Sequence, residues 1–196
     1  MKFRLALLSL LFATPLAALD LGAPFPDADV KMKSVDGRQV SIAEIAGKQG
    51  TLVVFTCNHC PWAKAWEKRI AALGNEYAGK GIGVIAINAN DPNANANDGY
   101  DGMVERAKAL GLQFPYVVDH GSAVAKAFGA ERTPEAFLFD AGGKLVYHGT
   151  IDDNAEDPAK VTAPYLANAL AAVAAGKPVE TKQTKALGCT IKFYPS

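Results

Sequence analysis

The 196-residue sequence has only three cysteines and three histidines, and its 20 Lys and Arg are balanced by 20 Asp and Glu. The lack of a basic patch argues against a nucleic-acid partner. Three cysteines are too few for a disulfide scaffold, and no internal repeat, dinucleotide motif or phosphate motif is visible. A hydrophobic fraction of 49% is enough for a packed core of one domain with extensions. The core therefore holds the fold, and the cysteines are free for chemistry.

The N-terminus has the layout of an export signal. Lys2 and Arg4 precede a short apolar run, "LALLSLLFA", and Pro15 and small residues follow it. This pattern predicts a secretory signal peptide over residues 1–18, in preference to a buried N-terminal helix, and the run is too short to span a bilayer. With no cysteine near the cleavage site to carry a lipid, we expect a periplasmic or secreted protein without a membrane anchor after cleavage. An oxidising compartment permits disulfides.

The first half of the mature chain predicts a strand–helix–strand unit. Two short strands flank a turn at Asp36–Gly37. A continuous apolar run, "TLVVF", is typical of a strand buried on both faces, and a helix from about Cys60 to Leu73 follows it. The next buried strand covers Ile82–Asn88. A strand, a helix and a strand in this order indicate a parallel pair with a crossover helix.

A polar segment, "ANDPNANANDGYDG", interrupts this pattern after the second buried strand. Its alternating Asp and Asn could suggest a calcium loop, but Ala96 and Gly102 stand where an EF-hand needs Gly and Glu. We expect a solvated surface loop. The later predicted elements, in chain order, are the helix "MVERAKALG", the strand "FPYVVD", the helix "SAVAKAFG", the hairpin "EAFLFD" with "LVYHGTI", and the helix "APYLANALAAVAAG".

The order of elements and several short motifs carry a family resemblance. The motifs are "VVFTCNHCPW", "AINANDP", "FPYVVD", "RTPEAFLFD", "GTIDDN" and "LGCTIK". Over residues 22–192 the chain resembles the redoxin branch of the thioredoxin superfamily, which includes alkyl hydroperoxide reductase-like proteins, and more narrowly a peroxiredoxin-like group. The resemblance implies an α/β thioredoxin-like fold over 22–176, with a central mixed sheet, flanking helices and an N-terminal β-hairpin. A tail, 177–196, follows.

The stretch "TCNHCPW" places Cys57 and Cys60 three positions apart at the start of a helix. Disulfide exchange needs an attacking thiolate and a second thiol close enough to release the mixed disulfide. Free N–H groups and the positive end of the helix dipole favour a thiolate there. We therefore predict that Cys57 attacks, is more exposed than Cys60, and has a lowered pKa.

Four further residues complete the predicted site. His59 lies between the cysteines, where an imidazolium would stabilise the Cys57 thiolate. By the family resemblance, the Thr133–Pro134 bond is cis and lies against the cysteine pair, although an ordinary trans proline at the start of a strand is the alternative. Asn58, Thr133 and Pro134 are expected to line the substrate cleft.

Segments at the carboxyl ends of the strands are expected to form the rim of this cleft. Ligands gather at this end of parallel strands. Asn88–Pro92 and Ile151–Asn154 both reach it in the predicted layout. Asp152 and Asp153 either contribute to the rim or are only solvated turn residues.

We predict an exported thiol–disulfide oxidoreductase that needs no cofactor and exchanges disulfides with a protein or small-molecule thiol partner.

A thiol peroxidase is the first alternative. A peroxiredoxin has a threonine three residues before its cysteine, but Val54 precedes Cys57 in this way. The position at which a peroxiredoxin carries its arginine holds Pro134 in this sequence. Arg132 is close to that position in the sequence but does not occupy it.

A zinc or copper site at Cys57, His59 and Cys60 is the second alternative. Structural zinc usually has four ligands, however, and the residues that could complete the set, Cys189, His120 and His148, are remote in sequence.

Cys189 is the spare thiol. The final helix is expected to end at Gly176 on the side away from the site, and the tail is long enough to return. The run "CTIKFY" predicts a short strand, which favours a packed and inert cysteine over a redox role. We therefore expect Cys57–Cys60 to be the disulfide of the oxidised protein and Cys189 to stay reduced.

Overall fold

The computed structural model describes residues 19–195. The predicted signal peptide, 1–18, lies outside the described residues. Within the described part of the chain, none of the helices combines the length and the apolar character needed to cross a membrane.

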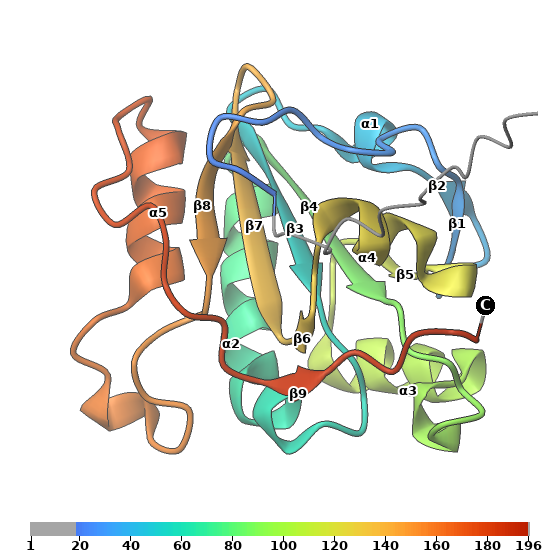
Figure 1. Ribbon diagram of the computed structural model, residues 1–196. Coiled ribbons are helices and arrows are strands. Elements are labelled where there is room, and N and C mark those ends of the chain that lie inside the picture. Colours follow the sequence, from blue (N-terminus) through green and yellow to red (C-terminus); the bar gives the residue numbers. More distant parts are fainter. Residues whose placement is uncertain (1–18, 196) are drawn as a thin grey trace, which may run out of the picture.

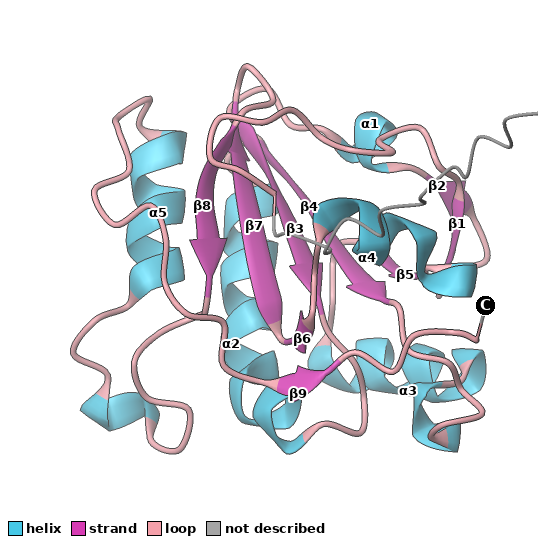
Figure 2. Ribbon diagram, viewed as in Figure 1, coloured by secondary structure: helices cyan, strands magenta, loops and turns pink. Residues whose placement is uncertain are grey.

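A seven-stranded mixed sheet forms the centre of the molecule (Figures 1 and 2), with strand order β2-β1-β5-β4-β3-β7-β8. β3 is parallel to β4, and β4 to β5, whereas β1–β5, β3–β7 and β7–β8 are antiparallel. This confirms the predicted strand–helix–strand unit and both hairpins. The strands are β1 (Met32–Ser34), β2 (Gln39–Val40), β3 (Gly50–Phe55), β4 (Ile82–Asn88), β5 (Tyr116–Val118), β7 (Glu135–Asp140) and β8 (Leu145–Gly149).

Helices cover both faces of the sheet because the central strands are apolar on both sides. In β3, Leu52 and Val54 pack on one face, and Val53 and Phe55 on the other. The first face is covered by α2 (Pro61–Ala78), α3 (Tyr100–Leu110) and α5 (Tyr165–Ala174), and the second by α1 (Ile42–Ile45) and α4 (Ala123–Phe128). The predicted α/β fold with a central mixed sheet, flanking helices and an N-terminal β-hairpin is confirmed.

The polar segment after β4 differs from the prediction. Its middle, 92–97, is solvated as predicted, but both ends fold inward: Asn90, Asp91 and Asp98 are buried. A single 3₁₀ turn (Ala96–Asp98) carries Asp98, and α3 starts directly after it, earlier than predicted. Burial of these polar groups is possible because each finds hydrogen-bond partners: Asp91 accepts the backbone N–H of Asn93, and the partners of Asn90 and Asp98 are described with the site.

The tail beyond α5 packs on the domain. It passes β8, where His148 donates its backbone N–H to Lys182, and then forms β9 (Cys189–Thr190). β9 pairs antiparallel with β6 (Arg132–Thr133) in a separate two-stranded sheet. Figure 1 shows this red strand lying below β6 and beside the start of α2, at the pole where β3 and β4 end.

Candidate active site

The two cysteines of the motif lie between the end of β3 and the start of α2. Cys60 is the N-cap of α2 and Pro61 is its first residue, where a missing N–H costs nothing. Cys57 lies three residues earlier, just after β3. Cys57 is 5% exposed and Cys60 is fully buried, so the predicted order of exposure is correct, but both thiols are inside the protein.

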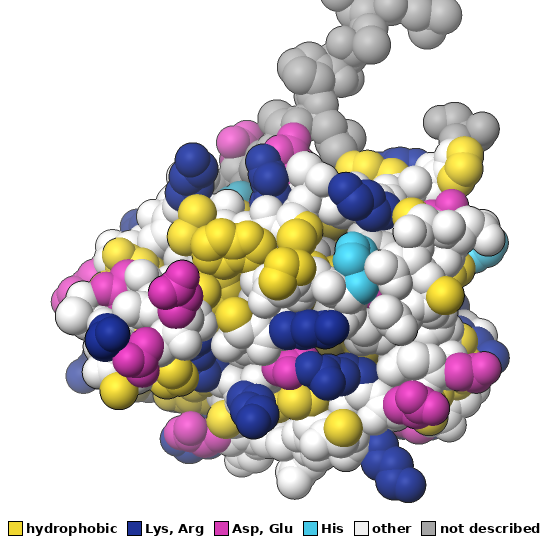
Figure 3. Space-filling view, turned by 90° about the horizontal axis from the view of Figure 1, so that it is seen from below, with side chains coloured by type: hydrophobic (Ala, Val, Ile, Leu, Met, Phe, Trp, Pro, Cys, Tyr) yellow, Lys and Arg dark blue, Asp and Glu magenta, His cyan; other side chains and the backbone are white. Residues whose placement is uncertain are grey.

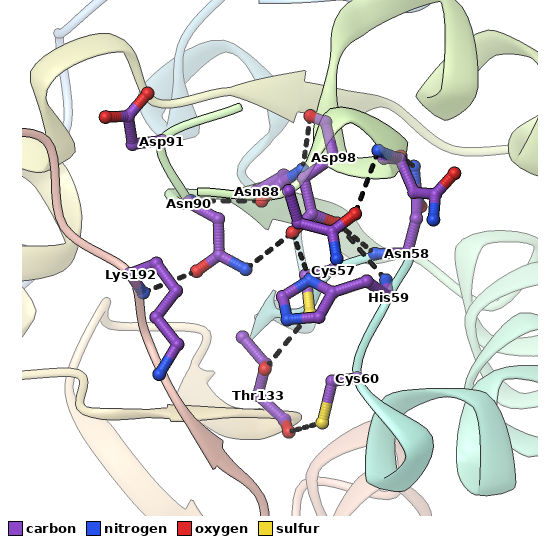
Figure 4. Close-up of polar contacts among 12 residues, drawn as sticks. Cys57, Asn58, His59, Cys60, Asn88, Asn90, Asp91, Asp98, Thr133 and Lys192 are labelled. Carbon is purple, nitrogen blue, oxygen red and sulfur yellow. Dashed lines mark hydrogen bonds and ion pairs between the residues drawn. The ribbon is translucent and has the colours of Figure 1, made fainter. Parts of the chain in front are cut away.

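Thr133, at the end of β6, contacts both sulfur atoms. The Thr133–Pro134 peptide bond is cis, as predicted. The hydroxyl Oγ1 of Thr133 lies 3.2 Å from Sγ of Cys57, and the Thr133 carbonyl oxygen accepts a 3.2 Å hydrogen bond from Sγ of Cys60. One buried residue therefore touches both thiols, from its side chain and from its backbone (Figure 4).

The acidity of the two thiols is the reverse of the prediction. A hydrogen bond from the Cys57 thiol lowers the pKa of Cys60 to about 4, and hydrogen bonds from Cys189 and the backbone N–H of Ala63 add to this. The pKa of Cys57 is raised, first by its hydrogen bond with Cys60 and then by burial and by the nearby Asp98 carboxylate. The N-cap position of Cys60 puts it nearer the N–H groups of the helix than Cys57. The Cys60 thiol donates its hydrogen to the Thr133 carbonyl oxygen, and its lowered pKa makes it the more acidic thiol of the pair.

Asp98 organises the loop that carries the motif, and the sequence prediction missed it. Its Oδ1 accepts backbone N–H groups from Asn58 at 2.7 Å and His59 at 3.2 Å. Its Oδ2 accepts the Asn90 side-chain amide at 2.9 Å and pairs with Nδ1 of His59. The segment follows the carboxyl end of β4, which could have drawn attention to it, but so many Asn and Asp occur there that no single one stands out.

His59 lies beside the thiols, as predicted, but it has a partner of its own. Nδ1 of its ring contacts Oδ2 of the buried Asp98 carboxylate. A ring nitrogen, an Asp98 oxygen and Sγ of Cys57 all lie within 4.8 Å of one another. Any effect of His59 on Cys57 is thus coupled to a carboxylate, which opposes the stabilisation of a Cys57 thiolate.

Asn58 borders a pocket with Cys57 and a surface hollow with Lys64 and Arg106, so its place in a substrate cleft stays a prediction. The residue is buried, and its side-chain amide donates to the Asn97 carbonyl oxygen at 2.7 Å. Its Oδ1 accepts a 3.0 Å hydrogen bond from the Tyr116 hydroxyl. Asn58 thus ties the motif to the neighbouring 3₁₀ turn and to β5.

The two segments expected at the rim of the cleft differ in their position relative to the site. Asn90, in the segment after β4, accepts the Lys192 backbone N–H on its Oδ1 at 2.8 Å, which joins this segment to the tail near the site. Asp152, in the segment after β8, is neither at the rim nor solvated. It is buried and accepts a 2.7 Å hydrogen bond from the Trp66 indole. Asp153 is an exposed turn residue that accepts the Thr162 backbone N–H.

Cys189 is close to the motif. In the β6–β9 register it lies opposite Thr133, and it packs against a cluster of Cys57, Cys60 and Ala63. Burial and its hydrogen bond with Cys60 raise the pKa of Cys189 to about 11. The predicted strand is present, but the cysteine is half-buried and lies beside the redox pair rather than in a separate packed position.

The donors of Cys57, His59 and Asp98 are close enough together to be considered for a metal ion. A sulfur, an imidazole and a carboxylate would suit zinc or copper. The Asp98 carboxylate, however, already accepts hydrogen bonds on both oxygens. A metal would have to displace these bonds, so the arrangement fits the positioning of the motif better than metal binding.

The pH dependence of the reduced thiols follows from their assignment. We expect a thiolate transition near pH 4, seen by ultraviolet absorbance, that is absent in Cys60→Ser and moves to higher pH in Cys57→Ser. Because the folded pKa of Cys60 lies below its unfolded value of about 8.5, the thiolate stabilises the reduced protein at high pH, and this stability is lost as pH falls through 4. A single transition near pH 8.5 would contradict the assignment.

Comparisons with known proteins agree with this geometry. The Redoxin family model matches residues 20–166. The chain belongs to this family. A curated relative, the thiol-disulfide oxidoreductase ResA of Halalkalibacterium halodurans, is 30% identical over 59% of this chain and 61% of its own length. The chain thus spans less than two thirds of that relative.

Solved structures show the extent of the fold. A hypothetical protein from Sinorhizobium meliloti superimposes with a TM-score of 0.84 and 35% identity, over 92% of this chain and 98% of that one. A thioredoxin-like protein solved in its oxidised form has a TM-score of 0.65 and 21% identity, over 81% of this chain and 99% of that one, and supports the fold alone. The predicted family, redoxin, and the predicted thioredoxin-like fold are confirmed.

Proposed function

We propose that the protein is a thiol–disulfide oxidoreductase that cycles Cys57 and Cys60 between a dithiol and a disulfide. The observation that carries this proposal is the contact of Thr133, next to the cis proline, with both sulfur atoms. The name of the curated relative, a thiol-disulfide oxidoreductase, supports the same class of reaction. The partners would be proteins or small molecules that carry a dithiol or a disulfide.

The residues around the pair have distinct roles in this proposal. Cys60 is the more acidic thiol and a good leaving group when a disulfide to it is broken, since a thiol of low pKa leaves faster. Cys57 holds the proton and closes the disulfide. Thr133 and Pro134 position the sulfur atoms from the opposite side, and Asp98 and His59 fix the loop between the cysteines. No step calls for a cofactor.

Turnover of a protein disulfide tests the proposal. In the reduction of insulin by dithiothreitol, we expect the protein to accelerate the reaction, and Cys57→Ser and Cys60→Ser each to lose at least roughly two orders of magnitude of that rate. Circular dichroism and thermal unfolding would establish that both variants fold. Unchanged turnover in either variant would remove the dithiol mechanism. The reduction potential of the pair would then tell an oxidant from a reductant.

A thiol peroxidase is the alternative activity, and the surroundings of Cys57 do not favour it. The guanidinium of Arg132 donates to the Gly188 carbonyl oxygen at 3.3 Å, so this charge is engaged with the tail. We expect hydrogen peroxide to oxidise the protein at the rate of an ordinary thiolate, without saturation. Stopped-flow kinetics that showed fast, saturable reduction of peroxide, lost in Cys57→Ser, would establish a peroxidase instead.

We also propose that the protein acts outside the cytoplasm, in the periplasm or as a secreted protein. The sequence of residues 1–18 supports this proposal, with Lys2 and Arg4 before a short apolar run. A mature N-terminus after this segment, in protein recovered from outside the cytoplasm, is the expected result. Uncleaved protein found only in the cytoplasm would exclude it.

A further inference from the structure

The tail strand β9 occupies the backbone edge next to the cysteine pair. Its residues pair with β6, with Thr190 opposite Arg132 and Cys189 opposite Thr133. The Ile191 backbone N–H extends the pairing to the Glu131 carbonyl oxygen at 2.9 Å. A side chain at Gly188 would meet the Thr133 carbonyl oxygen at 2.3 Å, so the close approach of the tail depends on glycine.

This register brings a third sulfur to the redox pair. Cys189 lies opposite Thr133 in this register, and the Thr133 carbonyl oxygen accepts the hydrogen bond of the Cys60 thiol, so Cys189 and Cys60 meet at the same residue. All three cysteines pack in one cluster with Ala63. Because Cys189 is held on a paired strand, its sulfur stays close to Cys60 without a rearrangement of the chain.

Cys189 is also the most accessible of the three. Cys60 is fully buried and Cys57 nearly so, whereas Cys189 is half-buried. Trp62 and Leu187, near Cys189, are exposed apolar side chains on which a protein could pack. Figure 3, which views this pole of the molecule from below, shows apolar side chains gathered beside several Lys and Arg side chains. A protein partner therefore reaches Cys189 before the buried pair.

We propose that Cys189 is a third exchange thiol, which carries the disulfide between the buried Cys57–Cys60 pair and a dithiol of a protein partner. The inference rests on the proposed dithiol function. In the first step, the Cys189 thiolate attacks Sγ of Cys60 in the Cys57–Cys60 disulfide. The Cys60–Cys189 bond forms, the Cys57–Cys60 bond breaks, and Cys57 takes the proton that Cys189 released. One disulfide replaces another, so no oxidant is consumed.

In the second step, a thiolate of the partner attacks the accessible sulfur of Cys189, and Cys60 leaves as a thiolate. The second thiol of the partner then attacks the partner's own sulfur in the mixed disulfide and releases Cys189. The partner gains a disulfide and gives up two electrons, which remain on Cys60 and Cys189. Cys60 is the sulfur common to both intramolecular disulfides, and Cys57 and Cys189, which pack in one cluster with it, replace each other as its partner.

Mapping of disulfides in two single variants tests the proposal. After oxidation of Cys57→Ser by diamide, non-reducing digestion and mass spectrometry should find an intramolecular Cys60–Cys189 bond in most molecules. Cys189→Ser, treated in the same way, should form Cys57–Cys60, which is the outcome required by the proposed function. Free thiols or only intermolecular bonds in Cys57→Ser, with Cys57–Cys60 formed normally in Cys189→Ser, would overturn the third-thiol proposal alone. Absence of the Cys57–Cys60 bond in Cys189→Ser would overturn the dithiol function and the proposal that rests on it.

A kinetic comparison provides a second readout. With a reduced protein as the electron donor, we expect Cys189→Ser to accept electrons at least roughly tenfold more slowly than the native protein, because the accessible thiol is missing. Thr190→Ala, a change of the neighbouring exposed residue in β9, is the matched control and should keep the native rate. Equal rates for the native protein and Cys189→Ser would contradict the relay.

Discussion

In an Asp98→Ala protein, we expect the free energy of unfolding to fall by about 3–4 kcal/mol, because at least two buried hydrogen-bond donors lose their acceptor. The carboxylate accepts the backbone N–H groups of Asn58 and His59 and the side-chain amide of Asn90. Thermal and denaturant unfolding of the reduced protein measure this loss. Asp101→Ala, which changes an exposed Asp in the next turn, is the matched control and should change stability by less than about 0.5 kcal/mol.

Asp98→Asn separates the charge of this residue from its hydrogen bonds. The amide oxygen can still accept the backbone N–H groups of the motif, so the loss of stability should be much smaller than in Asp98→Ala. The negative charge that raises the pKa of Cys57 is removed, and a dithiol whose thiolate is easier to form is more oxidising. We therefore expect a higher reduction potential. An unchanged potential together with a stability loss equal to that of Asp98→Ala would show that Asp98 does not act through its charge.

A Gly188→Ala protein should lose the close contact between the tail and the cis-proline loop. The new Cβ would lie 2.3 Å from the Thr133 carbonyl oxygen, and because this atom belongs to the backbone it cannot turn away. We expect the protein to lose about 1–3 kcal/mol of stability. Alkylation of Cys60 and Cys189 should become faster, since β9 covers both, and mass spectrometry at timed intervals measures this.

Gly79→Ala is the control for this change. At Gly79, φ is −69° and the nearest atom to a new Cβ lies 3.5 Å away, so the same substitution meets no obstacle there. We expect its stability and its alkylation rates to remain near those of the native protein. If Gly188→Ala behaved in the same way, the tail would have to be far less tightly held than its backbone pairing implies.

The sequence alone was sufficient for the fold, and it also led to the proposed dithiol chemistry of the pair. The apolar runs "TLVVF" and "IGVIAIN" specify strands buried on both faces, because an apolar side chain at every position suits a sheet covered by helices on each side. Two cysteines three positions apart before a helix imply dithiol exchange, since this spacing keeps the sulfur atoms together whatever the rest of the fold does. Each of these features depends on residues that are close together in the sequence, so it can be predicted from the sequence.

Only the tertiary structure decided how the site works. Asp98 lies far along the chain from the motif that it holds, and its role depends on a loop folding inward so that several N–H groups converge on one carboxylate. The lower pKa of Cys60 than of Cys57 depends on the hydrogen bond between the two thiols, on the same carboxylate, which raises the pKa of Cys57, and on the contact of Cys60 with Cys189. Cys189 reaches the pair through strand pairing with β6, and a sequence does not specify which strand edge a tail will occupy. Hydrogen bonds and electrostatic interactions between distant segments depend on the distances between atoms, and the fold alone sets those distances.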